Sequence, residues 1–422
     1  MIPSLRLGVL AAANLGLGFL FQWYALALLG PKEATDALFA GMTIPQIVLS
    51  VIAGSLMHVL VPLLAGEDEE RLGRDAWSLF ALVGGFFFVV ALVLYATARW
   101  WVPLTVPGFD EATQALTIKI TRIQLASMVF TAINGVQWAA YHARRRFLWA
   151  ELAPLLVNGL CLPILVWSLP RFGIVAAAWV NTLRTALITA LLAPGMGRPR
   201  LPNLGSPAIA QAWKRMRPLL LGAAYYKTDP LIERFLLSTA NAGSLSLYHL
   251  AQQIYGSVSQ LINRSVAAPL VPLLSMLHKA NDRAGLVRAY YRQLARLALL
   301  VLLGAPMLAA LGHLLLKLFI DQGSGSAAQG FWWIMLCLSG VFAGGVLGQI
   351  SSSLFFALGD TATPTRIGMI TYTIYIPAKI ALYSYFGPAG LAVSSSAFAL
   401  ANFALQHLSL RSRYLMAGAA DP

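Results

Sequence analysis

The chain alternates along its whole length between long apolar stretches and short polar ones. Residues 7–31, 76–98, 123–141, 152–170 and 322–359 contain no charged side chain. A helix of about 20 apolar residues spans the hydrocarbon core of a bilayer. The pattern predicts an all-α integral membrane protein with about 12 transmembrane helices. Their expected ranges are 7–30, 38–65, 76–98, 113–141, 147–169, 172–194, 216–238, 245–274, 293–318, 331–357, 366–386 and 389–410.

Composition agrees with this class, since 58% of the residues are hydrophobic, 11% are charged and the mean hydropathy is +0.70. The net charge of +14 alone would suit a nucleic-acid-binding protein, but the basic residues follow the positive-inside rule. Basic clusters on the side of the N-terminus lie within 71–74, 144–146, 198–217, 279–292 and 411–413. The opposite side has Lys32, Arg99, Arg171 and Lys317. We therefore predict that both termini are cytoplasmic and that nucleic acid is not a partner.

Two landmarks recur at half the chain length. The sequence Leu60–Leu64 (LVPLL) returns at Leu270–Leu274, and Arg171-Phe172-Gly173 is echoed by Tyr385-Phe386-Gly387. The offsets are 210 and 214 residues. Two halves with six helices each have the same orientation, so a pseudo-two-fold axis along the membrane normal is expected to relate them. The predicted division is a lobe at 1–194, a cytoplasmic linker at 195–215 and a second lobe at 216–422.

Charged side chains interrupt several predicted spans. They are Lys119, Arg122, Arg184, Lys227, Asp229, Glu233, Arg234, Arg264 and Lys379. A charge near the bilayer centre costs on the order of 3 kcal/mol, so these side chains are expected to line a hydrated interior. Such an interior indicates a protein that moves a polar solute across the membrane. For Arg184 two roles stay open, pairing within the first lobe together with Asn181, or contact with the substrate.

Short motifs in a fixed order carry a family resemblance. They are Ala34–Phe39 with Ile44-Pro45 and Val61-Pro62, then Val106–Phe109, Ala153-Pro154 with Asn158, Phe356–Thr361 with Thr363-Pro364, and Gly387–Leu391. In this order they resemble the MurJ/MviN lipid-linked oligosaccharide flippases of the multidrug/oligosaccharidyl-lipid/polysaccharide (MOP) superfamily. The resemblance implies a two-lobed transporter of the bacterial inner membrane. Its cargo would be a polyprenyl-pyrophosphate-linked glycan, either a peptidoglycan precursor or an exopolysaccharide unit, which alternating access passes from the inner to the outer leaflet.

The sequence departs from this family where the pyrophosphate is expected. Members usually carry arginines in helices 1, 2 and 8, whereas this chain has Leu15, Phe21, Leu49, Ser50 and Gln253 at those positions. Helices 13 and 14, which the resemblance implies for the lipid tail, have no counterpart among the predicted spans. Other residues must therefore hold an anionic headgroup.

Cationic hydrogen-bond donors suit such a headgroup. Lys119 and Arg122 share one helix face at i,i+3 spacing, and Lys227 and Arg234 share a face because they are seven residues apart. The predicted substrate contacts are Lys119, Arg122, Lys227, Arg234, Arg264 and Gln253. Two alternatives stay open, because the same charges can pair between helices as structural bridges or extend to the membrane surface.

Asp229 and Glu233 lie on nearly the opposite face of the predicted helix 216–238. The resemblance implies a sodium site between helices 7, 11 and 12 in some relatives, and Asp229 matches its helix 7 ligand. This chain has Lys379 at the helix 11 position, and its ammonium is predicted to pair with Asp229 or Glu233 in place of the ion. Asp36 is expected to cap or orient the outer end of helix 2, with gating as the alternative. No metal or cofactor is expected.

Three classes of protein stay open. A flippase would fit the mainly cationic in-span charges. An ion-coupled multidrug or cation antiporter of the same superfamily would favour carboxylates, and a non-transporting scaffold of a polysaccharide machinery would need neither. An enzyme is not expected, because the polar loops are short and carry no paired-carboxylate or phosphate-cradling motif. The expected partners are the lipid-linked glycan, membrane lipids and polysaccharide or cell-wall synthesis proteins, and the chain is expected to be a monomer.

Overall fold

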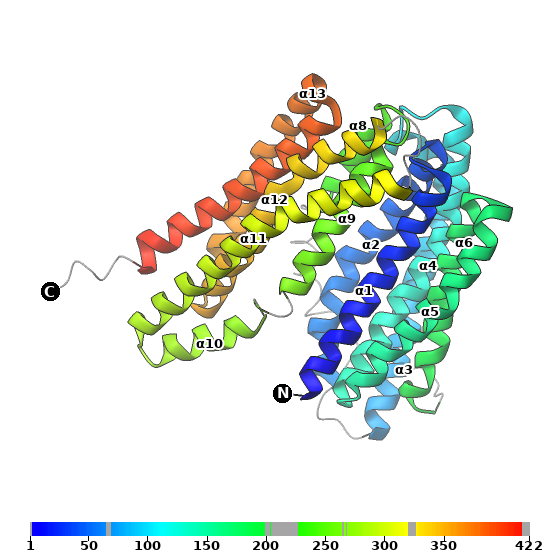
Figure 1. The fold of residues 1–422 in the computed structure, drawn as a ribbon. Coiled ribbons are helices and arrows are strands. Elements are labelled where there is room, and N and C mark those ends of the chain that lie inside the picture. Colours follow the sequence, from blue (N-terminus) through cyan, green and yellow to red (C-terminus); the bar gives the residue numbers. More distant parts are fainter. Residues whose placement is uncertain are drawn as a thin grey trace. The chain divides into compact units, whose positions relative to one another are not determined.

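The protein is described by a computed structural model over residues 2–64, 69–198, 203, 227–263, 266, 268–319 and 326–415. Every regular element in these ranges is helical (Figure 1). Nine helical stretches in this part of the chain are long and apolar enough to cross a membrane. One of them, Ala362–Tyr414, contains the last two predicted spans. The all-α membrane class is therefore confirmed.

The chain forms two compact units, an N-terminal unit at Met1–Ser246 and a C-terminal unit at Leu247–Pro422. The first contains α1 (Ile2–Leu29), α2 (Glu33–Leu64), α3 (Glu69–Thr105), α4 (Glu111–Ala143), α5 (Phe147–Phe172), α6 (Ile174–Leu192), the short 3-10 helix η1 (Ala193–Met196) and α8 (Asp229–Ser238). Helix α9 (Ser244–Ile262) begins in the first unit. The second continues with α10 (Ala268–Lys279), α11 (Arg283–Phe319), α12 (Ser326–Ala357), α13 (Ala362–Leu410) and η3 (Arg411–Leu415). The predicted division at 194 and 216 stays a prediction.

Helix α4 is central to the N-terminal unit, because it packs against α2, α3 and α6, while α5 packs against α1 and α6. Gly41 of α2 permits one of these close approaches, since a Cβ there would lie 2.9 Å from Ile120 of α4. The buried core on one side of α4 includes Leu38 and Ile188, and on the other side it includes Phe87. These apolar contacts fix the positions of the polar side chains described below.

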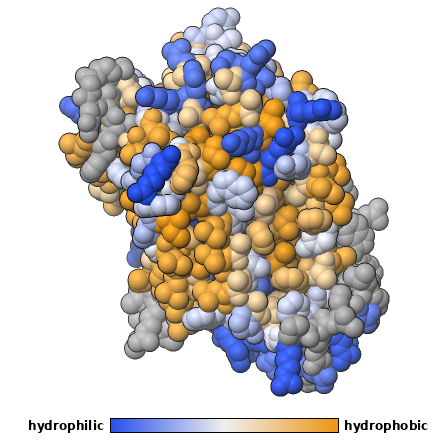
Figure 2. Space-filling model, turned by 90° about the vertical axis from the view of Figure 1, so that its right-hand side faces the viewer, coloured by the Kyte–Doolittle hydropathy of each residue, from blue (hydrophilic) through white to orange (hydrophobic). Residues whose placement is uncertain are grey.

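The outer surface of the helices is apolar. Figure 2 shows hydrophobic residues over the middle of one face of the molecule and hydrophilic residues gathered towards its ends. Exposed large hydrophobic side chains on α5 and α6 include Leu160, Trp167 and Trp179. Contiguous exposed apolar surface of this kind marks contact with a membrane or a partner, and here the long helices indicate lipid.

The predicted internal repeat is visible in the backbone. The first residues of α3 and α11 are 214 positions apart, and so are their last residues. Gly173, which joins α5 to α6, has its counterpart 214 residues later in Gly387. Gly173 has φ 63° and ψ −160°, and Gly387 has φ 57° and ψ −140°. This conformation is essentially confined to glycine. Gly387 divides α13 into two helical segments, as the predicted spans 366–386 and 389–410 require.

The turns that follow α4 and α12 repeat as well. Arg145 has φ 59° and Gly359 has φ 80°. In both turns the next N–H reaches back five residues, from Arg146 to Tyr141 at 2.9 Å and from Asp360 to Phe355 at 3.0 Å. Thr363 donates to Asp360 from its hydroxyl and its N–H, which holds the pKa of that carboxyl below its ordinary value. The family motif around Asp360 is therefore a helix end followed by a capped helix start.

Candidate functional site

An interior cavity of about 230 Å³ lies within the N-terminal unit, mainly between α1, α2, α4 and α6. We call it the Arg184 cavity. Its polar lining residues are Gln22, Gln46, Gln124, Ser127, Thr131, Asn181, Arg184 and Thr185. Among the lining residues that the structure describes, Arg184 is the one with a charged side chain, and Phe21 and Leu49 form part of the apolar wall. The cavity therefore combines apolar walls with one cation and several uncharged polar side chains.

A chain of side-chain amides holds Arg184 in place. Arg184 Nη2 donates to Asn181 Oδ1 at 2.8 Å, and Asn181 Nδ2 donates to Gln124 Oε1 at 2.7 Å. On the other side Arg184 Nη1 lies 3.5 Å from Asn158 Oδ1, and Asn158 donates to Asn14 Oδ1 at 3.3 Å. Helices α1, α4, α5 and α6 each contribute one or two members of this chain. All its acceptors are neutral, so none of them balances the charge of Arg184.

Two donors at the cavity have no hydrogen-bond partner. They are Arg184 Nε and Gln124 Nε2, and both atoms are buried. The guanidinium also lies over the ring of Phe21, with 5.2 Å between Cζ and the ring centroid. Leaving a buried donor unsatisfied costs about 1–3 kcal/mol, so such an arrangement calls for a functional explanation.

The positions of two absent family arginines fall at this same cavity. Phe21 and Leu49, where the family resemblance implies arginines, both line it. Arg184 reaches the space from α6 and stacks on Phe21. A cation is thus present in the region, but it comes from a different helix.

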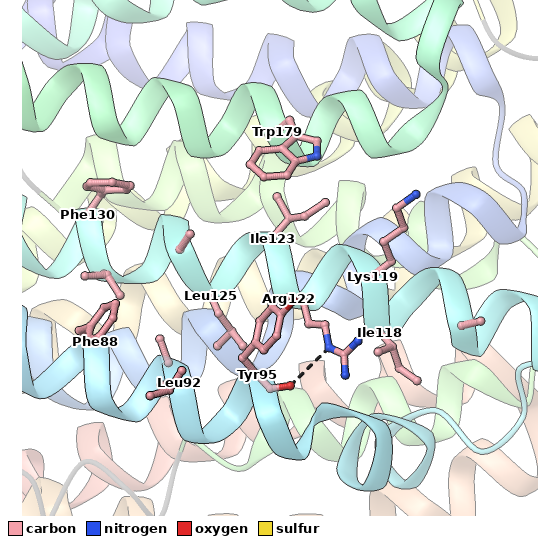
Figure 3. A pocket seen from close by; sticks show the side chains of 14 residues that line it. Phe88, Leu92, Tyr95, Ile118, Lys119, Arg122, Ile123, Leu125, Phe130 and Trp179 are labelled. Atoms are coloured by element: carbon pink, nitrogen blue, oxygen red, sulfur yellow. Dashed lines mark hydrogen bonds between the residues drawn. The ribbon is translucent and has the colours of Figure 1, made fainter.

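Lys119 and Arg122 line a second hollow, a groove of about 650 Å³ between α3, α4 and α6 (Figure 3). We call it the Lys119 groove. The two cations lie towards one end, and Phe88 and Phe130 lie towards the other. Arg122 Nε donates to the backbone oxygen of Tyr95 at 3.3 Å, and its Cζ lies 4.9 Å from the Tyr95 ring centroid. The groove is amphiphilic, with a cationic end and an apolar end.

The two hollows lie on different faces of α4. Lys119 and Arg122 share one face, as their spacing predicts, whereas Gln124 and Ser127 line the Arg184 cavity. Contact of Lys119 and Arg122 with substrate stays a prediction.

Of the predicted helix 216–238, residues 216–226 lie outside the described part of the chain, and α8 covers Asp229–Ser238. The prediction that Lys227 shares a helical face with Arg234 was wrong, because Lys227 lies in a turn and α8 begins at Asp229. Pro230 explains this start, since proline lacks an N–H and is tolerated in the first helical turn. Glu233 and Arg234 are buried, and Arg234 Nε donates to Thr43 of α2 at 3.1 Å.

Asp36 of α2 caps the start of α9 rather than its own helix. Its carboxylate accepts hydrogen bonds from Gly243 N at 2.7 Å, from Ser246 N at 2.8 Å and from the Ser246 hydroxyl. Nearby, Gly108 N donates to the Ser238 hydroxyl at 3.2 Å. These contacts tie α2 and the turn after α3 to the segment that runs from α8 into α9.

In the C-terminal unit, Lys379 is fully buried in α13, and its Nζ lies 4.8 Å from the Tyr375 ring centroid. Gln253 lies half-buried in α9. Arg264 falls outside the described residues. Pairing of Lys379 with Asp229 or Glu233 and the predicted roles of Gln253 and Arg264 stay predictions.

Several residues of the amide chain were not singled out from the sequence as site residues. Asn14 and Gln124 belong to this group, and Asn158 was noted only as part of a family motif. Each is a polar residue inside an otherwise apolar span, and that signal identifies candidates but not which of them meet.

A duplicated bundle of long apolar helices with cations and amides in its interior is an arrangement typical of polytopic membrane transporters, and solved structures share its fold. One similar structure is that of a "Lipid II flippase MurJ, inward closed conformation", at TM-score 0.82 and 17% identity, covering 96% of this chain and 87% of that one. Another is the inward-facing conformation of a multidrug resistance MATE family transporter of the MOP superfamily, at TM-score 0.74 and 16% identity, covering 99% and 96%.

Sequence comparison identifies the family. The lipid II flippase MurJ of Burkholderia cenocepacia is 24% identical over 414 residues, which cover 91% of this chain and 78% of that protein. The sequence model of the family "Lipid II flippase MurJ" matches residues 26–419. The chain belongs to the MurJ family, a family of membrane transporters.

Proposed function

We propose that this chain is a flippase that moves lipid II, the polyprenyl-pyrophosphate-linked precursor of peptidoglycan, from the inner to the outer leaflet of the bacterial inner membrane. Its membership of the MurJ family supports this cargo over an exopolysaccharide unit. The observation that carries the proposal is that the charged side chains lining the Arg184 cavity and the Lys119 groove are positive. Among the described residues, the Arg184 cavity and the Lys119 groove are lined by cations and by no carboxylate.

This polarity favours an anionic headgroup over an organic cation. A guanidinium in a space of low dielectric attracts a pyrophosphate and offers it planar, charge-assisted hydrogen bonds. The same group would repel a cationic drug, which needs a carboxylate or an aromatic cage instead. A lipid-linked pyrophosphate glycan is thus the better match than the substrate of a cation antiporter.

The proposed cycle is alternating access, and Asp36 supplies a gating contact within it. Asp36 accepts hydrogen bonds from Gly243 N and Ser246 N, and Ser238 accepts one from Gly108 N. In the proposed cycle these bonds break when this end of the pathway opens. Arg234 adds an electrostatic attraction to Asp36 and a hydrogen bond to Thr43. Together they stabilise the state in which this end is closed.

Replacement of the resident flippase in a living bacterium tests the proposed cargo. Cells depleted of their own lipid II flippase are expected to keep growing when this chain is expressed in their inner membrane. The same cells with an empty vector should lyse. Continued lysis with the protein present at normal level in the membrane would contradict lipid II as the cargo.

A further inference from the structure

We propose that Arg184 and Gln124 form the binding site for one phosphate group of the cargo headgroup, inside the N-terminal unit. This inference rests on the proposed function, since that function supplies the pyrophosphate. It adds the residues that bind the phosphate, which come from α6 and α4 rather than from α1 and α2.

The free donors point to an acceptor that is not part of the protein. Gln124 is 3% exposed, and its Oε1 accepts from Asn181, so the amide is oriented with Nε2 unpartnered. Arg184 Nε is unpartnered too, while Nη2 is held by Asn181. Two N–H groups without a partner, one of them charged, therefore belong to residues that line one cavity.

The charge of Arg184 selects an anion. Its hydrogen-bond acceptors, Asn181 and Asn158, are neutral, and no carboxylate lines the cavity within the described residues. Phosphate oxygens would satisfy the guanidinium by charge-assisted bonds of the kind arginine makes best. A carbonyl or hydroxyl ligand would satisfy the hydrogen bonds but leave the charge without a counterion in a region of low dielectric.

The size of the cavity limits what it can hold. Its volume of about 230 Å³ lies below the roughly 300–1,000 Å³ typical of pockets for drug-sized ligands. A phosphate group fits this space. The α1 and α2 side of the cavity carries the uncharged amides of Gln22 and Gln46 beside Phe21 and Leu49, so the positive charge lies on the α6 side.

The competing explanation is that Arg184 has a purely structural role and links α5 to α6 through its contacts with Asn158 and Asn181. The two explanations differ in the response to pyrophosphate. Arg184→Met removes a charge without a counterion, but it also leaves Asn181 Oδ1 and Asn158 Oδ1 without this donor, so the stability of the ligand-free protein does not separate them. A residue that only bridges the helices predicts that pyrophosphate stabilises wild type and Arg184→Met equally, whereas a phosphate site predicts that the variant loses this stabilisation.

Binding of inorganic pyrophosphate to the purified full chain in detergent tests the site. Pyrophosphate is expected to raise the melting temperature of the wild type, and Arg184→Met should weaken its binding at least tenfold. Gln124→Leu should weaken binding by a smaller factor, and Arg184→Lys should retain part of it. Arg171→Met is the matched control, because Arg171 is an exposed arginine that stacks on Trp167 with 4.3 Å between Cζ and the ring centroid. It should bind like the wild type.

Two results would overturn the inference. They are an absence of pyrophosphate binding by the wild type and unchanged affinity in Arg184→Met. Loss of binding in Lys119→Ala/Arg122→Ala with retention in Arg184→Met would instead assign the phosphate to the Lys119 groove. Lipid II flipping by the same proteins in vesicles separates this site from the proposed function. Equal flipping by wild type and Arg184→Met would contradict the Arg184 site but not the proposed flippase function. Pyrophosphate binding that depends on Arg184, without lipid II flipping by the wild type, would contradict the flippase function.

Discussion

At the scale of single residues, three cations inside the spans each lie over an aromatic ring. The pairs are Arg122 with Tyr95 at 4.9 Å, Arg184 with Phe21 at 5.2 Å, and Lys379 with Tyr375 at 4.8 Å. A cation over a ring gains about 0.5–2 kcal/mol, most when it is desolvated. The rings therefore lower the cost of keeping positive charge in the membrane without neutralising it.

Replacing Lys379 tests whether its charge balances an acid. Lys379 is fully buried, and we propose pairing with Asp229 or Glu233. Lys379→Ala should destabilise the protein by about 3–5 kcal/mol, since it leaves a buried carboxylate uncompensated. Added sodium should then recover part of the melting temperature. Lys317→Ala, at an exposed end of α11, is the control. Unchanged stability together with no response to sodium would end the proposal.

The sequence predicts the cations but only some of their partners. Tyr375 and Lys379 are four residues apart on one helix, so their contact follows from the spacing. Phe21 and Arg184 come from α1 and α6, and only the packing of the helices brings them together. The Arg184 cavity was therefore not predictable as a site, although its charged member was noted.

At the scale of elements, the backbone conformations between helices are more similar in the two halves of the chain than the amino-acid sequences are. Gly173 and Gly387 share one backbone conformation, and the glycine echo in the sequence predicts this joint. Arg145 adopts the conformation of Gly359 without being glycine, so the sequence carries no signal for that turn. The turn at Lys227 was not predicted, because the apolar pattern continues across Pro230 in the first turn of α8.

Gly387→Ala tests the importance of the joint. Alanine at φ 57° and ψ −140° should cost about 1–3 kcal/mol, because a Cβ disfavours this region even though the space around it is open. Gly159→Ala in α5 is the control, since its surroundings are also open and its φ is not positive. That variant should be neutral or slightly stabilising. Thermal unfolding in detergent measures both, and equal melting temperatures would contradict the strained-joint explanation.

At the scale of the whole molecule, we propose that the contacts around Asp36 open and close during transport. Asp36→Cys/Ser246→Cys in a Cys161→Ala/Cys337→Ala background places two thiols where a carboxylate and a hydroxyl now meet. Oxidation should stop flipping by joining α2 to α9, and reduction should restore it. The reduced protein is the internal control. Flipping that continues at the same rate after complete disulfide formation would show that these elements do not separate during transport.

The orientation of the chain follows from its basic loops. We expect both termini to be cytoplasmic, since the arginine-rich segments around 71–74, 144–146 and 411–413 lie on the side of the N-terminus. A C-terminal fusion to a reporter that is active only in the cytoplasm should be active, and a fusion to one active only in the periplasm should not. The reverse result would invert the direction assigned to every helix.

The rate at which fluorescent lipid II crosses the bilayer of vesicles containing the purified chain tests the central claim most directly. Protection of the headgroup from an external quencher reports the crossing, and protein-free vesicles supply the background. The cationic hollows predict rapid exchange of lipid II between leaflets and no uptake of a fluorescent organic cation in the same vesicles. Lipid II exchange at the background rate, or uptake of the cation instead, would contradict the account.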